Sequence, residues 1–145
     1  MAHQLATIGY ESATQAEMIG KLKDAGVEIV IDVRAVAASR RAGFSKTLLA
    51  GSLKEAGIDY LHLRDLGTPK EGRMAARAGR TDEMHRIFEG HLEEPAAQLA
   101  LSEACQIASE RKAALLCYEA SAAECHRRIL ADIIQERAGV EVVDL

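Results

Sequence analysis

Aromatic side chains are scarce in this chain. Tryptophan is absent, and three tyrosines and two phenylalanines make up only 3% of the 145 residues. Sheets that recognise RNA need exposed aromatic rings on which the bases stack. The composition therefore argues against a protein that binds nucleic acid through an aromatic platform.

Long apolar runs are also missing. No apolar segment approaches the roughly 20 residues that a helix needs to span a bilayer. The first ten residues, MAHQLATIGY, lack the charged-then-apolar layout of an export signal. The three cysteines, an odd number, fit a reducing compartment. We therefore expect a cytoplasmic protein with no membrane partner.

The rest of the composition is typical of a globular protein. Hydrophobic residues make up 48% and charged residues 28% of the chain. A chain of this length buries enough surface to fold without a metal or a disulfide, so residues 1–145 are predicted to be one domain.

The net charge is −4, from 22 acidic and 18 basic residues. No global positive field is therefore present to attract nucleic acid. Residues 34–46 differ, because they include Arg34, Arg40, Arg41 and Lys46 and no acid. A local basic pocket on an acidic protein favours a small anionic ligand or nucleotide over a long polyanion.

Strand and helix patterns alternate along the chain. Strands are predicted over residues 5–8, 27–33, 58–63, 113–117 and 140–144, and helices over 15–25, 45–56, from 81, 95–112 and 122–137. Thr14 with Glu17 and Ser121 with Glu124 form capping-box pairs at two helix starts. The alternation predicts a single α/β domain with a mostly parallel open sheet of about five strands and helices on both faces, a Rossmann-like three-layer arrangement. Residues 66–79 look like a long basic loop that could cover a site.

Polar and ionisable side chains follow the predicted strands at their carboxyl ends. These ends are Tyr10-Glu11-Ser12, Asp32-Val33-Arg34, His62-Leu63-Arg64-Asp65 and Cys117-Tyr118-Glu119. Parallel strands bring their carboxyl ends to one edge of the sheet, where ligands bind in open α/β folds. We therefore expect the clusters to converge on one crevice.

The last predicted helix adds basic groups next to this crevice. Helical spacing places Cys125 with the apolar face of this helix, in the core. Arg128 pairs with neighbours on the helix surface, whereas Arg127 has no such partner and is favoured as an anion contact. His126 either points into the crevice or holds a loop carbonyl, and the two alternatives have equal support.

These groups predict a pocket for a phosphate or carboxylate at a helix N-terminus. Glu119 would stay ionised beside the arginines and serve as a base or metal ligand, and His126 would handle protons. For Arg34, an ion pair with Asp32 or Glu119 is the structural alternative. The predicted site residues are Glu119 and His126 as catalytic groups, and Tyr10, Ser12, Arg34, Arg40 and Arg127 as substrate or anion contacts.

The favoured function is an enzyme acting on a phosphorylated small molecule, a nucleotide or a nucleic-acid end. The alternatives are a non-catalytic anion- or nucleotide-sensing module, a nuclease with a metal on Asp32 and Glu119, and a rhodanese- or phosphatase-like thiol enzyme using Cys117. A zinc site is weakly supported because no Cys-x-x-Cys pair is present. No cofactor and no oligomeric state follow from the residues.

Short motifs follow one another along essentially the whole chain. They are Thr7-Ile8-Gly9-Tyr10, Asp32-Val33-Arg34, Ser39-Arg40, Gly43-Phe44-Ser45-Lys46, Gly57-Ile58-x-Tyr60, Leu66-Gly67, Cys117-x-Glu119 and Cys125-His126-Arg127. This ordered set resembles the domain of unknown function 488 family, uncharacterised α/β proteins of bacteria and archaea. The resemblance implies a single cytoplasmic α/β domain and assigns no activity. Ala37 and Thr68 depart from a proline and a glycine that the family often has there; both lie in loops facing the expected crevice and bear on the ligand more than on the fold.

Overall fold

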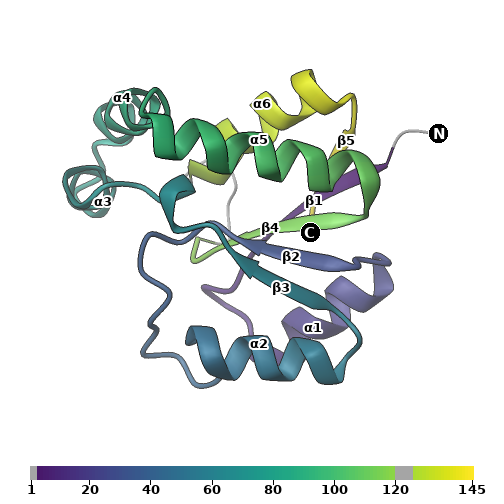
Figure 1. Ribbon diagram of the computed structural model, residues 1–145. Coiled ribbons are helices and arrows are strands. Elements are labelled where there is room, and N and C mark those ends of the chain that lie inside the picture. Colours follow the sequence, from purple (N-terminus) through teal and green to yellow (C-terminus); the bar gives the residue numbers. More distant parts are fainter. Residues whose placement is uncertain (1–2, 120–125) are drawn as a thin grey trace.

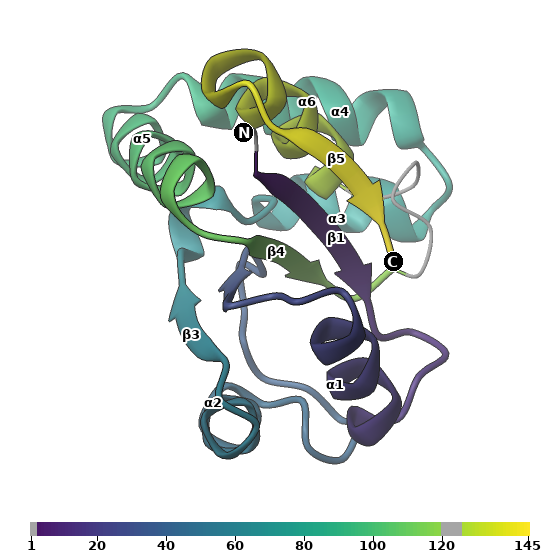
Figure 2. The same ribbon diagram turned by 90° about the vertical axis from the view of Figure 1, so that its right-hand side faces the viewer.

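A five-stranded parallel sheet forms the centre of the molecule (Figure 1). The computed structural model describes residues 3–119 and 126–145. The strands are β1 (Gln4–Gly9), β2 (Ile29–Asp32), β3 (Asp59–His62), β4 (Ala113–Cys117) and β5 (Glu141–Asp144), in the order β3-β2-β4-β1-β5. The sheet has the usual twist, which is visible from the side (Figure 2).

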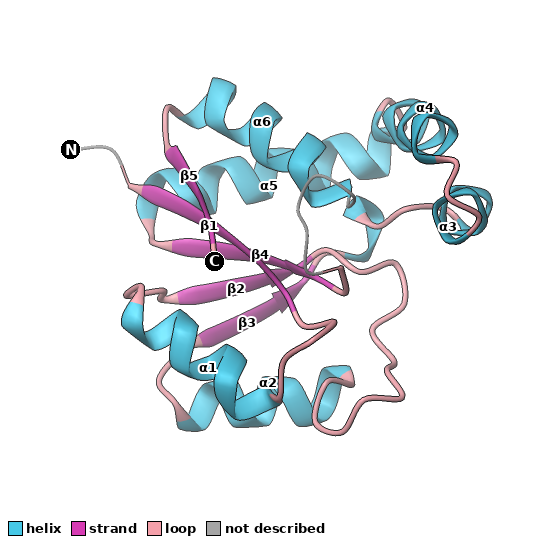
Figure 3. Ribbon diagram, turned by 180° about the vertical axis from the view of Figure 1, so that it is seen from behind, coloured by secondary structure: helices cyan, strands magenta, loops and turns pink. Residues whose placement is uncertain are grey.

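Helices cover both faces of this sheet (Figure 3). On one face lie α1 (Gln15–Asp24) and α2 (Lys46–Glu55). On the other lie α5 (Pro95–Glu110) and α6 (His126–Ala138), and α3 (Lys70–Arg77) and α4 (Thr81–Leu92) stand beside them, at the left of Figure 1. A short 3-10 helix, Arg64–Leu66, links β3 to α3. The predicted α/β class, with a parallel sheet between two helical layers, is confirmed.

Burial explains why the central strands read as continuous apolar runs. Every residue of β2 and of β4 is buried, because these strands have neighbours on both sides and helices on both faces. One apolar cluster packs the sheet against α4, α5 and α6, and a second packs it against α1 and α2. In the described part of the chain, no helix has both the length and the apolar character needed to cross a membrane.

One of the two predicted capping boxes is confirmed. The Thr14 hydroxyl accepts a hydrogen bond from the Glu17 backbone N–H (3.1 Å), and the Glu17 carboxylate accepts one from the Thr14 N–H (2.9 Å). The second predicted capping box, at residues 121 and 124, lies outside the described residues, as does Cys125.

The prediction of a loop over residues 66–79 is wrong, because α3 occupies most of this segment. The glycine and the charged residues of α3 are not typical of a buried helix, so the sequence pattern does not predict it. Contacts with α4 explain why it forms: Ala75 is buried, and a Cβ on Gly72 would lie 3.3 Å from Cγ2 of Ile87. The segment is thus a packed helix that can form a wall of a site.

Candidate functional site

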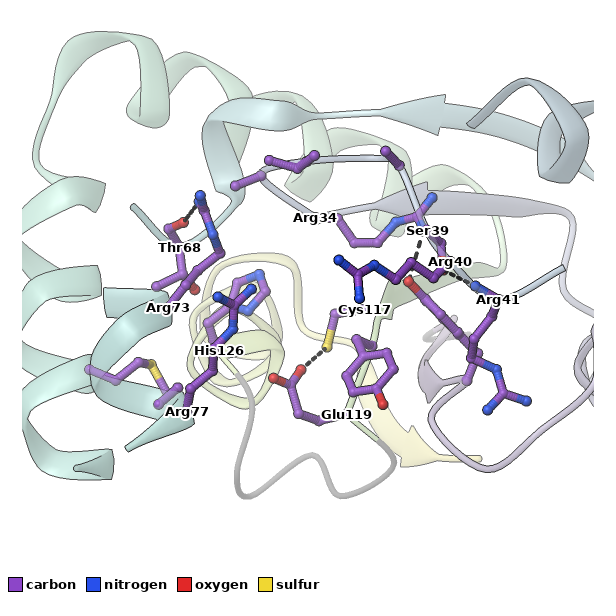
Figure 4. A pocket seen from close by; sticks show the side chains of 17 residues that line it. Arg34, Ser39, Arg40, Arg41, Thr68, Arg73, Arg77, Cys117, Glu119 and His126 are labelled. Carbon is purple, nitrogen blue, oxygen red and sulfur yellow. Dashed lines mark hydrogen bonds between the residues drawn. The ribbon is translucent and has the colours of Figure 1, made fainter. Parts of the chain in front are cut away.

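The chain connections create a crevice beside β4. β1 and β2 lead to helices on one face of the sheet, whereas β3 leads to α3 and β4 precedes α6 on the other face. Because β4 lies between β1 and β2, neighbouring connections diverge on both of its sides, which is where open α/β sheets bind ligands. A cleft of about 880 Å³ lies there (Figure 4).

Three of the four predicted strand-end clusters contribute to this cleft. Tyr10, Arg34 and residues 117–119 line it. The fourth cluster borders an adjoining groove instead, through His62 and Arg64. The predicted convergence is therefore correct for the ends of β1, β2 and β4.

Arginines dominate the lining of the cleft. Among the described residues it contains five arginines and one carboxylate: Arg34, Arg40, Arg41, Arg73, Arg77 and Glu119. Arg73 and Arg77 come from α3 on one side, Arg40 and Arg41 from the β2–α2 segment on the other, with Glu119 between them (Figure 4). A strongly positive cleft thus lies on a protein whose net charge is −4.

Arg34 is committed to a buried ion pair. Its Nε and Nη2 donate to the Asp32 carboxylate at 2.9 and 2.6 Å, and its Nη1 donates to the Tyr10 hydroxyl (3.0 Å) and to the Phe44 carbonyl (2.7 Å). Burial opposes the charge of Arg34, but the bonds to Asp32 outweigh it and raise the pKa of the guanidinium. The pairing of Arg34 with Asp32 is the structural alternative considered above, so this arginine has little capacity left for a ligand.

The other four arginines have no carboxylate partner among the described residues. Arg40 and Arg77 are exposed and make no hydrogen bond or ion pair there. Arg41 donates to the carbonyls of residues 11 (2.7 Å) and 13 (2.6 Å), and Arg73 donates to the Thr68 carbonyl (2.8 Å). Hydrogen bonds to backbone carbonyls therefore hold the guanidinium groups of Arg41 and Arg73 in place. No carboxylate among the described residues neutralises the charge of any of the four arginines.

Serine hydroxyls shape the segment that presents Arg40 and Arg41. The Ser39 N–H donates to the Ser45 hydroxyl (3.1 Å), which donates back to the Ser39 carbonyl (3.2 Å). The Ser39 hydroxyl in turn accepts from the Arg41 N–H (3.1 Å). Ser45 immediately precedes α2, but its hydroxyl makes no bond to the helix and instead closes the segment that carries Arg40 and Arg41.

Glu119 is held where the ends of β1 and β4 approach closely. The backbone N–H groups of Tyr10 and Glu11 donate to the Tyr118 carbonyl (3.1 and 2.8 Å). Arg127 donates to the Glu119 carbonyl and to Sγ of Cys117. Backbone contacts therefore fix the segment that carries the one carboxylate found in the described lining of the cleft.

Cys117 lines the cleft next to Glu119. Its Sγ is 3.5 Å from Oε2 of Glu119 (Figure 4).

His126 combines the two roles considered for it. Its Nε2 donates to the Val33 carbonyl (2.8 Å), its ring packs edge-on against Phe88 (5.0 Å between centroids), and it lines the cleft. Burial, assisted by the charge of Arg127, lowers the pKa of His126 to about 4. The imidazole is therefore neutral at pH 7 and suits a base or acceptor role better than an acid role.

The lowered pKa of His126 predicts a pH effect on stability. The unfolded histidine takes up a proton near pH 6.5, whereas the folded one does so only near pH 4. The stability from neutral His126 is thus complete above pH 6.5 and is lost as the pH falls to 4, by roughly 3 kcal/mol. Urea unfolding at several pH values should show a steeper loss in the wild type than in His126→Gln, whose amide can still donate to Val33. Parallel curves for the two proteins would contradict this account.

Two predicted ligand contacts do not line the cleft. Arg127 is 1% exposed and is bound to the segment behind Glu119. Ser12 is exposed but outside the lining. Tyr10 does line the cleft, though it is nearly buried and its hydroxyl already accepts a bond from Arg34.

Sequence reasoning missed Arg73 and Arg77. The basic character of residues 66–79 was the available signal. Only the helical spacing of α3, which puts residues four apart on one face, shows that both side chains can reach one cleft.

Metal binding finds little support in the described residues. They contain no group of three or more histidine, cysteine or acidic side chains that could hold a metal ion. Asp32, a ligand in the nuclease hypothesis, is completely buried and bonded to Arg34 and Tyr60. Burial and the bond to Asp32 raise the pKa of the Tyr60 hydroxyl, which stays protonated and donates.

Comparison with known families agrees with the motifs around the cleft. The family model described as "Domain of unknown function DUF488" matches residues 14–134. The chain belongs to the DUF488 family. The match includes Asp32, Arg40, Glu119 and His126 and ends before β5; β1 and Tyr10 precede it. No curated protein and no solved structure shows significant similarity to this DUF488 chain.

Proposed function

We propose that the cleft binds a phosphate-bearing small molecule, a nucleotide or a nucleic-acid end. The observation that carries the proposal is a set of four arginines on the walls of one cleft that have no carboxylate partner within residues 3–119 and 126–145: Arg40, Arg41, Arg73 and Arg77. Arginine presents a planar fork of donors that matches the oxygens of phosphate. The protein as a whole has a net charge of −4, so the excess of positive charge in this lining is a local feature.

The lining also offers groups for chemistry on such a ligand. Glu119 stands between the two arginine-bearing walls and is the candidate base (Figure 4). His126 is neutral at pH 7 and is the candidate proton acceptor beside it. This arrangement supports a hydrolase or transferase acting on a phosphorylated substrate, in a protein that we place in the cytoplasm.

A non-catalytic sensing module is the second candidate. It is favoured by the excess of binding groups over acid–base groups in the lining of the cleft. The two candidates differ in what Glu119→Gln does: in an enzyme the variant binds ligand and loses turnover, whereas in a sensor binding remains and no turnover exists to lose.

Removing one arginine from each wall should weaken phosphate binding. We expect Arg40→Gln and Arg77→Gln each to lower affinity for pyrophosphate about tenfold or more, because a hydrogen bond to a charged group contributes about 1.5–3 kcal/mol. The measurement is calorimetric titration, supported by the shift in unfolding midpoint. A ligand at a hundred times its Kd should stabilise the wild type by about 2.7 kcal/mol.

Arg86→Gln is the matched control, because Arg86 is an exposed arginine on α4 outside the cleft lining. It should bind like the wild type. Absence of binding of phosphate, pyrophosphate and nucleoside phosphates by the wild type would overturn the proposal. Equal losses in Arg86→Gln and Arg40→Gln would show that only net charge matters.

A further inference from the structure

One aromatic ring is exposed at the cleft. The chain has five aromatic residues, of which Tyr10, Phe44 and Phe88 are buried and Tyr60 is half-buried. Tyr118 is 46% exposed and lines the cleft beside Glu119. In a protein this poor in aromatics, the exposed ring thus lines the same cleft as the arginines for which the described part of the chain offers no carboxylate partner.

The Tyr118 ring rests on a rigid support. Its ring packs edge-on against Tyr10 (5.4 Å between centroids, 84° between planes). Tyr10 stacks in turn on Phe44 (4.3 Å, 9°) and lies under the guanidinium of Arg34. The backbone carbonyl of Tyr118 accepts two N–H groups from residues 10 and 11. The ring is therefore held in place before any ligand arrives, which lowers the entropy cost of using it.

We infer that the ligand is a nucleotide, whose base stacks on Tyr118 while its phosphate is bound by the arginines. This inference rests on the proposed phosphate site. A planar base is the common chemical partner of an exposed ring next to phosphate-binding arginines, and such stacking does not depend on base identity. The cleft volume, about 880 Å³, is within the range of small-molecule sites.

The low aromatic content is consistent with this inference. It excludes a platform on which several bases of a strand stack, but one base needs one ring. Apolar side chains in the same lining, including Val36, Ala76 and Met84, give the base further surface to contact. A single nucleotide therefore fits the lining better than a strand.

The test measures the contribution of the base to affinity separately from that of the phosphate. Calorimetric titrations with adenosine and uridine monophosphates, ribose 5-phosphate and inorganic phosphate are made on the wild type, Tyr118→Ala and Tyr118→Phe. We expect the nucleotides to bind the wild type about tenfold or more tightly than ribose 5-phosphate. Tyr118→Ala should lose this advantage and leave ribose 5-phosphate binding unchanged, and Tyr118→Phe should retain it.

The outcomes distinguish the nucleotide assignment from the proposed phosphate site on which it rests. If ribose 5-phosphate binds as tightly as the nucleotides, or if Tyr118→Ala leaves nucleotide affinity unchanged, the nucleotide assignment is wrong and the phosphate site stands. If Tyr118→Ala weakens ribose 5-phosphate and nucleotides equally, the ring only supports the cleft, and the assignment is again wrong. If none of the four compounds binds the wild type, the phosphate site itself is wrong.

Discussion

Asp32→Ala is expected to destabilise the protein by about 3–5 kcal/mol, because it leaves a buried guanidinium without its counter-charge. The Asp32 carboxylate accepts side-chain bonds from Arg34 and Tyr60 and a backbone bond from the N–H of Arg34 (3.1 Å). Arg34 is 6% exposed, so water cannot replace these bonds. Chemical denaturation at pH 7 measures the effect.

Asp59→Ala is the matched control for this change. Asp59, on β3, pairs at 2.8 Å with Arg111, the residue that follows α5, but the Asp59 side chain is 68% exposed, so the loss should stay below about 1 kcal/mol. The double variant Asp32→Ala/Arg34→Met should recover much of the stability, because it also removes the buried charge. If Asp32→Ala costs no more than Asp59→Ala, the buried pair is not the stabilising element described here.

Gly9→Ala is expected to destabilise the protein by at least about 3 kcal/mol. A Cβ on Gly9 would lie 1.7 Å from the Glu119 carbonyl oxygen and 2.4 Å from its carbon. These are backbone atoms, so no side chain can rotate away, and the ends of β1 and β4 would have to separate. The φ angle of Gly9 is not positive, so the effect comes from crowding alone.

Gly51→Ala provides the opposite control. Gly51 lies inside α2, and a Cβ there would meet nothing within 4 Å. Alanine has the higher helix propensity, so this variant should be more stable by about 0.5–1 kcal/mol. Thermal unfolding of the two variants should move in opposite directions. A Gly9→Ala protein as stable as the wild type would contradict the close approach.

Asp32→Ala and Gly9→Ala should alter the positions of residues that line the cleft as well as the stability of the fold. Arg34 contacts Tyr10, whose ring packs edge-on against Tyr118, and Gly9 permits the approach that holds Glu119. The buried ion pair and the crowded glycine therefore fix the positions of groups that a ligand would touch. Ligand binding should weaken in any variant of Asp32 or Gly9 that still folds.

Much of the fold follows from local sequence patterns. The prediction of residues 113–117 as a strand agrees with β4 at both ends, because this central strand is apolar throughout and is buried on both faces. The Thr14–Glu17 box marks the start of α1, because a capping box satisfies backbone donors within one turn of chain. Helix α3 escaped prediction because its stability depends on contacts with α4, which short-range patterns do not encode.

The sequence by itself determined the parallel α/β architecture and the edge at which polar groups gather, since apolar periodicity is a local property and the alternation of strands with helices favours a parallel sheet whose carboxyl ends share one edge. It placed Arg40, Glu119 and His126 near one another for the same reason. Only the tertiary structure decided which arginines remain available. Arg34 and Arg127 are bound within the core, and Arg73 and Arg77 reach the cleft from α3. The physical reason is that pairing and burial of a charge depend on neighbours distant in the chain, which composition and spacing do not specify.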